Sequence, residues 1–130
     1  MMKAMVWTKY GAPDVLQLRD IPIPTPTDNQ VLIKTRAATV TLGDCEIRNL
    51  QILPAFRPLM RMWLGWSRPK RIQVLGMEMA GDVVAVGKDV TRFKVGDAVF
   101  GTTGMYFGAY AEYVCISLDG ETHGVLAHLP

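Results

Sequence analysis

Short apolar runs, each ended by glycine or by a turn, constrain the fold of this chain more than any other feature. These runs are rich in valine, isoleucine, threonine, tyrosine and phenylalanine, which favour β-strands. Val31 and Ile33 fall on one face of their run and Lys34 and Arg36 are offset from it, which is typical of a half-buried antiparallel strand. We expect strands over residues 4–8, 15–19, 31–40, 79–86, 98–100 and 109–117. Many short strands with few helical stretches predict a mainly β fold with short helices, either a barrel or a sandwich.

Glycines and prolines mark the connections between these runs. Residues 86–89 and 95–97 are predicted turns, in which Gly87 and Gly96 would adopt the positive φ that other residues resist. Residues 21–26 contain three prolines, each without a backbone donor, so they cannot join a central strand. We interpret this segment as an extended surface connection between strands rather than as a domain linker.

Residues 49–71 interrupt the β pattern. The chain has no acidic residue between Glu46 and Glu78, whereas six basic residues occur over that stretch, and apolar residues recur among them at helical spacing. A short amphipathic helix is predicted over residues 59–66, with Pro58 near its start. The helix could cover a barrel opening, close as a lid over an apolar substrate, or contact an anionic lipid or nucleic acid surface. The sequence leaves these alternatives open.

Composition excludes several classes of protein. The 130 residues suffice for one domain with a real core, and a formal net charge of +2 is too small to indicate nucleic acid binding. The apolar runs are shorter than the ~20 residues of a membrane span, so we expect no stable membrane insertion. The first residues do not resemble a signal peptide, and Cys45 and Cys115 form no CxxC pair, which favours a reducing cytoplasmic location.

Familiar catalytic motifs do not occur in the sequence. It contains no G-x-G-x-x-G, no P-loop and no G-x-S-x-G, so the chain has no recognisable cradle for a dinucleotide or phosphate. His123 and His128 are five residues apart, which does not align them on one helix face as metal ligands. Cys45 follows Asp44 at the start of an expected helical turn, but no histidine base is near in sequence, so we interpret its thiol as incidental.

The glycine-containing runs nevertheless follow a joint pattern. Residues 75–87 read LGMEMAGDVVAVG, residues 89–101 read DVTRFKVGDAVFG, and residues 108–114 read GAYAEYV. Together with the opening Met2-Lys3-Ala4, they resemble medium-chain dehydrogenases/reductases over nearly the whole chain. The resemblance implies a GroES-like, partly open β-barrel over residues 1–130, which supplies the substrate side of a cleft. A Rossmann domain that binds most of the NADPH would follow it.

The same resemblance bears on zinc. The family pattern of zinc-dependent alcohol dehydrogenases has a G-x-C-x-x-D segment followed later by G-H-E. By this resemblance, Thr41 and Met77 stand where the cysteine and histidine ligands would. A hydroxyl and a thioether are poor Zn²⁺ ligands. The resemblance is therefore to the zinc-free branch, which includes quinone oxidoreductases and enoyl reductases. We expect a small quinone or conjugated enone substrate, reduced by hydride transfer.

Five residues are candidates for the active-site cleft by this resemblance. Thr41 would face nicotinamide and substrate as a hydrogen-bond donor, and Asp44 would act beside it or order the loop by capping a helix. The expected cleft also includes Arg48, Glu78 and Tyr110. Two rival hypotheses remain. The barrel could be a non-enzymatic module that binds an anionic partner through residues 48–71, or a zinc-type alcohol dehydrogenase domain with displaced ligands.

Overall fold

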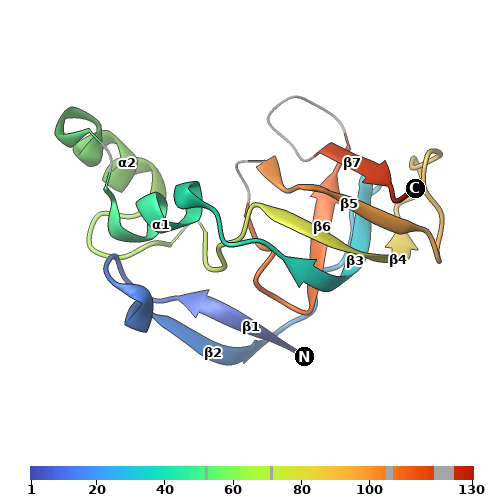
Figure 1. The fold of residues 1–130 in the computed structure, drawn as a ribbon, viewed down its shortest axis with the longest axis horizontal. Coiled ribbons are helices and arrows are strands. Elements are labelled where there is room, and N and C mark those ends of the chain that lie inside the picture. Colours follow the sequence, from blue (N-terminus) through green and yellow to red (C-terminus); the bar gives the residue numbers. More distant parts are fainter. Residues whose placement is uncertain (52, 71, 105–106, 119–124) are drawn as a thin grey trace.

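The computed structural model describes residues 1–51, 53–70, 72–104, 107–118 and 125–130. These residues form seven β-strands and two short α-helices, so the mainly β prediction is confirmed. Strands β1 (Met2–Trp7) and β2 (Leu16–Ile21) pair as a separate hairpin. The main sheet is wholly antiparallel and curls around its core (Figure 1). Its order is β6 (Tyr113–Ser117), β3 (Gln30–Ala38), β4 (Glu78–Val86), β5 (Ala98–Thr102) and β7 (Val125–His128).

Strand β3 is central, and its register explains the core. Val31 pairs with Val86 on β4 and with Ile116 on β6, and two residues later Ile33 occupies the same face. Val31 and Ile33 are fully buried, whereas Lys34 is exposed, as the alternation predicts. Burial of each such side chain contributes about 1.5–3 kcal/mol. The buried cluster under this sheet contains Val31, Ile33, Met79, Val83, Phe93, Val99, Ala109, Val114, Ile116 and Leu126.

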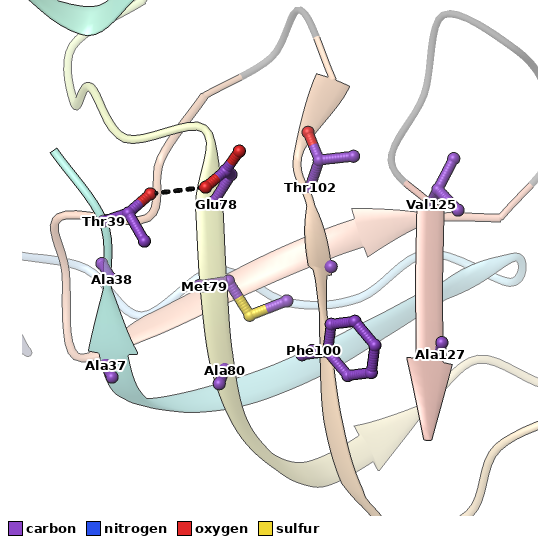
Figure 2. A pocket seen from close by; sticks show the side chains of 11 residues that line it. Ala37, Ala38, Thr39, Glu78, Met79, Ala80, Phe100, Thr102, Val125 and Ala127 are labelled. Atoms are coloured by element: carbon purple, nitrogen blue, oxygen red, sulfur yellow. Dashed lines mark hydrogen bonds between the residues drawn. The ribbon is translucent and has the colours of Figure 1, made fainter. Parts of the chain in front are cut away.

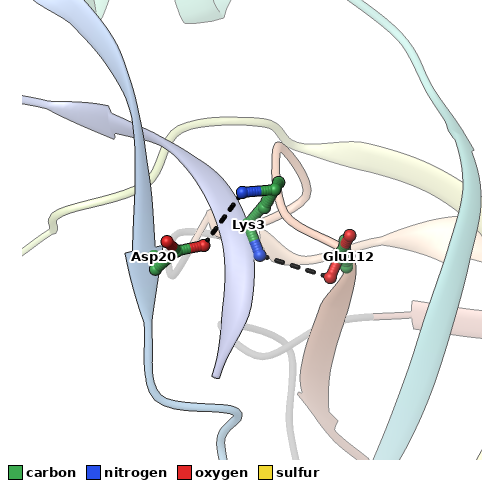
Figure 3. Close-up of polar contacts among 3 residues, drawn as sticks. All are labelled: Lys3, Asp20 and Glu112. Atoms are coloured by element: carbon green, nitrogen blue, oxygen red, sulfur yellow. Dashed lines mark hydrogen bonds and ion pairs between the residues drawn. The ribbon is translucent and has the colours of Figure 1, made fainter.

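Backbone contacts attach the β1–β2 hairpin to the main sheet. Ala4 forms an isolated antiparallel bridge with Ala111, and the Lys3 backbone N–H donates to a carboxylate oxygen of Glu112 at 3.2 Å. The Lys3 ammonium reaches Asp20 on β2 at 3.2 Å (Figure 3). That ion pair lies within the hairpin, and both side chains are about three-fifths exposed, so it contributes little stability. The hairpin is joined to the main sheet by the contacts with Ala111 and Glu112.

The two α-helices lie at the end of the molecule away from β7 (Figure 1). Helix α1 covers Leu42–Asn49, and a 3-10 turn over Pro54–Phe56 leads into α2, Arg57–Leu64. Pro58 lies in the first turn of α2, where its missing N–H costs nothing. No helix among the described residues is long and apolar enough to cross a membrane. A second buried cluster lies under the helices and contains Trp7, Val15, Leu64, Ile72, Leu75 and Phe107.

Several expected boundaries are wrong. The predicted strand over residues 109–117 begins only at Tyr113, so Tyr110 lies in a loop rather than on a strand. The helix predicted over residues 59–66 begins and ends two residues earlier. Strand β7 was missed, because its residues have little β pattern of their own and pair only with the distant β5. Of the predicted connection over residues 21–26, Ile21 ends β2, whereas residues 22–26 join no strand, as their prolines predict.

The two predicted glycine turns differ in their physical basis. Gly96 has a φ of +98°, as expected for a turn that requires glycine. Gly87 does not have a positive φ, so that part of the prediction is wrong. It is required for space instead, because a Cβ there would lie 2.1 Å from the carbonyl oxygen of Thr27. The glycine lets the end of β4 pass close to the turn before β3.

Candidate functional site

The buried carboxylate of Asp44 organises the start of helix α1. Thr41 precedes the helix in an extended conformation, and its hydroxyl accepts from the Asp44 backbone N–H at 3.2 Å. In return, Asp44 Oδ2 accepts from the Thr41 backbone N–H at 3.1 Å and from the Thr41 hydroxyl at 2.9 Å. This reciprocal arrangement is a capping box, with a negative charge in the first helical turn. The capping role considered for Asp44 from the sequence is therefore present.

Two segments far along the chain also reach this carboxylate. The Gly76 backbone N–H donates to Asp44 Oδ1 at 3.2 Å, and the Tyr110 hydroxyl lies 3.1 Å from Asp44 Oδ2. Gly76 permits this approach, since its φ is +105° and a Cβ there would lie 2.8 Å from atoms of Ala109 and Tyr110. Asp44 is only 3% exposed, yet its two oxygens have four donors around them. The site is thus pre-organised by hydrogen bonds rather than by apolar packing.

The phenol of Tyr110 is held in its neutral form. Partial burial and the nearby negative charge of Asp44 raise the pKa of Tyr110 well above its usual value, and the Asp44 hydrogen bond adds to this. Its single proton faces two acceptors, because the Thr39 carbonyl oxygen also lies 3.1 Å from the hydroxyl. Tyr110 can therefore serve as a hydrogen-bond donor at neutral pH, but not as an anionic base.

An open groove of about 490 Å³ lies beside this network. It follows the face of β4, β5 and β7 and is lined mostly by small or apolar side chains (Figure 2). Glu78 and Thr39 are among its polar side chains, and the Thr39 hydroxyl donates to Glu78 Oε2 at 2.8 Å (Figure 2). The groove is thus suited to a flat apolar ligand with few polar atoms. It is lined by Ala37, Ala38, Thr39, Glu78, Met79, Ala80, Phe100, Gly101, Thr102, Val125 and Ala127.

Arg48 stands apart from the groove. Its Nε donates to the Gly11 carbonyl oxygen at 3.0 Å, and its Nη1 lies 3.8 Å from the Cys45 sulfur. The structure therefore connects four of the five predicted cleft residues, Glu78 through Thr39, and places the fifth at the other end of α1. In that position, Arg48 fastens the helix to the loop after β1.

The other histidines and cysteines considered from the sequence show no catalytic arrangement among the described residues. His128 Nε2 lies 3.0 Å from a carboxylate oxygen of Asp97, with its ring against Phe93, and His123 lies outside the described residues. Cys115 is half-buried on β6, and burial raises the pKa of its thiol to about 11. Neither group faces the Asp44 network in a described contact.

The described residues at the two zinc-ligand positions do not fit a catalytic zinc ion. The two positions that resemble the zinc ligands do come together, since the Thr41 hydroxyl oxygen lies 4.0 Å from the Met77 sulfur. They bring a hydroxyl and a thioether, neither of which is a good ligand for Zn²⁺. Within the described ranges, no group of three or more His, Cys, Asp or Glu residues could hold a metal ion.

Sequence reasoning missed two features of this site. Thr39 connects Tyr110 to Glu78, but a lone threonine near the end of a strand gives no signal of such a role. Phe100 is not among the predicted cleft residues, yet it is 44% exposed and lines the groove. Its alternation with the fully buried Val99 was the available signal.

The fold and the site together define a class of protein domain. A curled antiparallel sheet with a separate hairpin, a capped helix and an apolar groove at its edge is the architecture that the sequence resemblance implied. Residues 27–124 match the family model of the alcohol dehydrogenase GroES-like domain. The chain belongs to this family, within the medium-chain dehydrogenase/reductase superfamily, and the predicted GroES-like fold is confirmed.

Individual relatives agree with this assignment. The chain is 38% identical over 124 residues to a quinone oxidoreductase of Sus scrofa, covering 92% of this chain and 32% of that protein. A quinone oxidoreductase from Coxiella burnetii has a similar structure, with a TM-score of 0.78, 34% identity, and coverage of 98% and 36%. The Escherichia coli quinone oxidoreductase complexed with NADPH has a TM-score of 0.74 and 29% identity, covering 98% of this chain and 33% of that one. The chain thus spans about a third of the length of these relatives.

Proposed function

We propose that this chain is the substrate-side domain of a larger oxidoreductase that uses NADPH and reduces quinones or conjugated enones without zinc. The observation that carries the proposal is the apolar groove, whose lining residue Thr39 contacts Tyr110, a hydroxyl donor ordered by the buried Asp44 carboxylate. The quinone oxidoreductase relatives support the same reaction class, and one of them is a complex with NADPH.

The groove suits the proposed substrate better than it suits a simple alcohol. A quinone or enone is a flat, apolar ring or chain with a carbonyl oxygen, and it can accept hydride without a Lewis acid because its double bonds are conjugated. The carbonyl oxygen becomes negative during the reaction, so a fixed donor near it lowers the barrier. Thr41 and Tyr110 are the proposed donors, and Asp44 positions both hydroxyls. Each hydroxyl has one proton, which now points at Asp44, so donation to the substrate would replace that hydrogen bond.

NADPH would supply the hydride when it is bound, and most of its binding is expected from a Rossmann domain. This division follows from the sequence, which has no glycine-rich cradle for a pyrophosphate. The residues of this chain would exclude water from the apolar groove and orient the substrate. Cys45 and Cys115 are both free thiols, which supports the cytoplasmic location predicted for this protein.

The test is steady-state NADPH oxidation by the complete protein with a panel of quinones and enones, with and without a strong zinc chelator. We expect quinone- or enone-dependent turnover that the chelator leaves unchanged. Failure to oxidise NADPH with any member of the panel would contradict the substrate class. Activity that is lost with chelator and restored by Zn²⁺ would instead establish a zinc enzyme with displaced ligands.

Variants locate the donors. Tyr110→Phe should lower kcat/KM by about tenfold or more, which corresponds to one hydrogen bond to a charged group. Tyr113→Phe is the matched control, because Tyr113 lies on β6 and makes no described contact with Asp44. Thr41→Val should lower activity, whereas Thr41→Ser keeps the hydroxyl and should restore most of it. Equal losses in Tyr110→Phe and Tyr113→Phe would remove Tyr110 from the site.

A further inference from the structure

The outward face of helix α2 is apolar, which is the reverse of an ordinary surface helix. Leu59, Met62 and Trp63 are at positions i, i+3 and i+4, so they share one face of the helix, and they are 63%, 76% and 37% exposed. Leu64, by contrast, is buried at 1%, and Met60 packs beside it against the second core cluster. A helix on the surface of a globular protein normally directs polar residues outward. Leu59 and Met62 of this helix are instead well exposed.

The apolar surface continues on both sides of the helix. Leu53 and Phe56 precede it at 68% and 53% exposure, and Trp66 follows it at 62%. Large apolar residues that are exposed singly are common, but a contiguous group of this kind marks an interaction site. We call this group the α2 patch, and it consists of Leu53, Phe56, Leu59, Met62, Trp63 and Trp66.

The contacts under the helix hold this patch in place. The Tyr10 hydroxyl donates to the Gly65 carbonyl oxygen at 2.6 Å, and Arg61 Nη1 donates to the Trp66 carbonyl oxygen at 2.7 Å. The Arg61 guanidinium also lies over the Tyr10 ring, 5.1 Å from its centre. The Arg61 side chain therefore links helix α2 to Tyr10 and to the Trp66 carbonyl oxygen. Helix α2 itself lies at the left-hand end of the view in Figure 1.

Basic residues predominate beside the patch, although Asp20 lines the same hollow as Arg68 and Lys70. Arg57, Arg68 and Lys70 are exposed beside it, and the chain has no acidic residue between Glu46 and Glu78. A partner that binds this surface must bury the apolar side chains of the patch and must itself carry negative charge. An anionic phospholipid bilayer meets both requirements, because its headgroups attract the cations while tryptophan, leucine and methionine side chains enter the acyl boundary. Nucleic acid offers the charge, but no apolar layer for Leu59 and Met62.

We propose that the α2 patch binds the surface of anionic phospholipid bilayers, as a peripheral contact. This proposal does not depend on the substrate proposed above. The helix has eight residues and is far too short to span, so it lies on the membrane rather than in it. Trp63 and Trp66 would sit at the headgroup level, with Arg68 and Lys70 against lipid phosphates.

The test is co-sedimentation of the complete protein with vesicles of phosphatidylcholine alone or with phosphatidylserine added. We expect binding to the anionic vesicles with a blue shift of tryptophan emission, and weak binding to the neutral ones. Arg68→Gln with Lys70→Gln should lower the partition coefficient about 30-fold, at about fivefold per cation. The matched control is Lys34→Gln with Lys94→Gln, which removes two exposed cations elsewhere and should change binding much less.

A second pair of variants tests the apolar contribution. Leu59→Asn with Met62→Gln should lower the partition coefficient about tenfold or more, without lowering the thermal midpoint. Leu18→Asn with Val95→Gln is the control, since both residues are similarly exposed, at 63% and 62%, but lie outside the patch. The proposal is overturned if anionic vesicles are not bound, or if the Leu59 and Met62 changes leave binding intact. It is also overturned if sedimentation velocity shows that the patch instead joins two copies of the chain, or if a single-stranded oligonucleotide competes fully with vesicles.

Discussion

Removal of the Asp44 carboxylate is the sharpest test of how the candidate site is built. Its oxygens accept from the Thr41 backbone, the Thr41 hydroxyl, the Gly76 backbone and the Tyr110 hydroxyl, at 2.9 to 3.2 Å. Each hydrogen bond contributes about 1 kcal/mol net, so Asp44→Ala should lower the free energy of unfolding by about 3–4 kcal/mol. That is a large fraction of the roughly 5–15 kcal/mol expected for a domain.

Urea unfolding, followed by tryptophan fluorescence, measures this change. Asp44→Asn retains one acceptor oxygen and should cost about half as much, which keeps the test valid if the alanine variant does not fold. The control is Asp20→Ala, which removes a carboxylate from an exposed ion pair with Lys3 and should cost less than about 0.5 kcal/mol. If Asp44→Ala costs no more than Asp20→Ala, the Asp44 network does not stabilise the fold and our account of the site is wrong.

Two further predictions follow from the geometry. Gly87→Ala should cost about 3 kcal/mol or more, because the new Cβ meets backbone atoms, whereas Gly96→Ala should cost about 1–2 kcal/mol from its φ alone, as urea midpoints would show. Because the pKa of Tyr110 is raised on folding, its contribution to stability is present below its unfolded pKa and is lost as pH rises above about 10. Tyr110→Phe should flatten that decline in a Cys115→Ala, Tyr10→Phe background, where the other raised pKa values are absent; an unchanged slope would contradict it.

The strands were predictable because their signal is local. Val31 and Ile33 alternate with polar neighbours, and the same alternation decides which face is buried in the folded sheet. The class of fold and the sheet interior follow from such patterns. Strand β7 was not predicted in this way, because its four residues are too few to show a clear alternation.

In the Asp44 network, too, local contacts could be predicted from the sequence, whereas contacts between distant segments could not. The spacing of Thr41 and Asp44 indicates a capped helix start, and the structure contains that cap. The approach of Gly76 and Tyr110 is different, since it depends on a positive φ at one residue and on two loops that meet. No periodicity encodes a meeting of loops. Family resemblance could point to Tyr110, but its hydrogen-bond partners required the folded chain.

Helix α2 shows why an amphipathic pattern does not by itself orient a helix. The sequence places apolar residues on more than one side, at Leu59, Met60, Trp63 and Leu64, and burial of the larger group would be the ordinary expectation. The structure buries Leu64 and partly buries Met60 instead, and Arg61 on the adjoining side stacks on Tyr10 and donates to the Trp66 carbonyl oxygen. An exposed cation–π contact contributes about 0.5–1 kcal/mol, whereas burial of one large apolar side chain contributes about 1.5–3 kcal/mol. The packing of Leu64 and Met60 against the second core cluster therefore contributes more to the orientation of the helix than the Arg61 contact does.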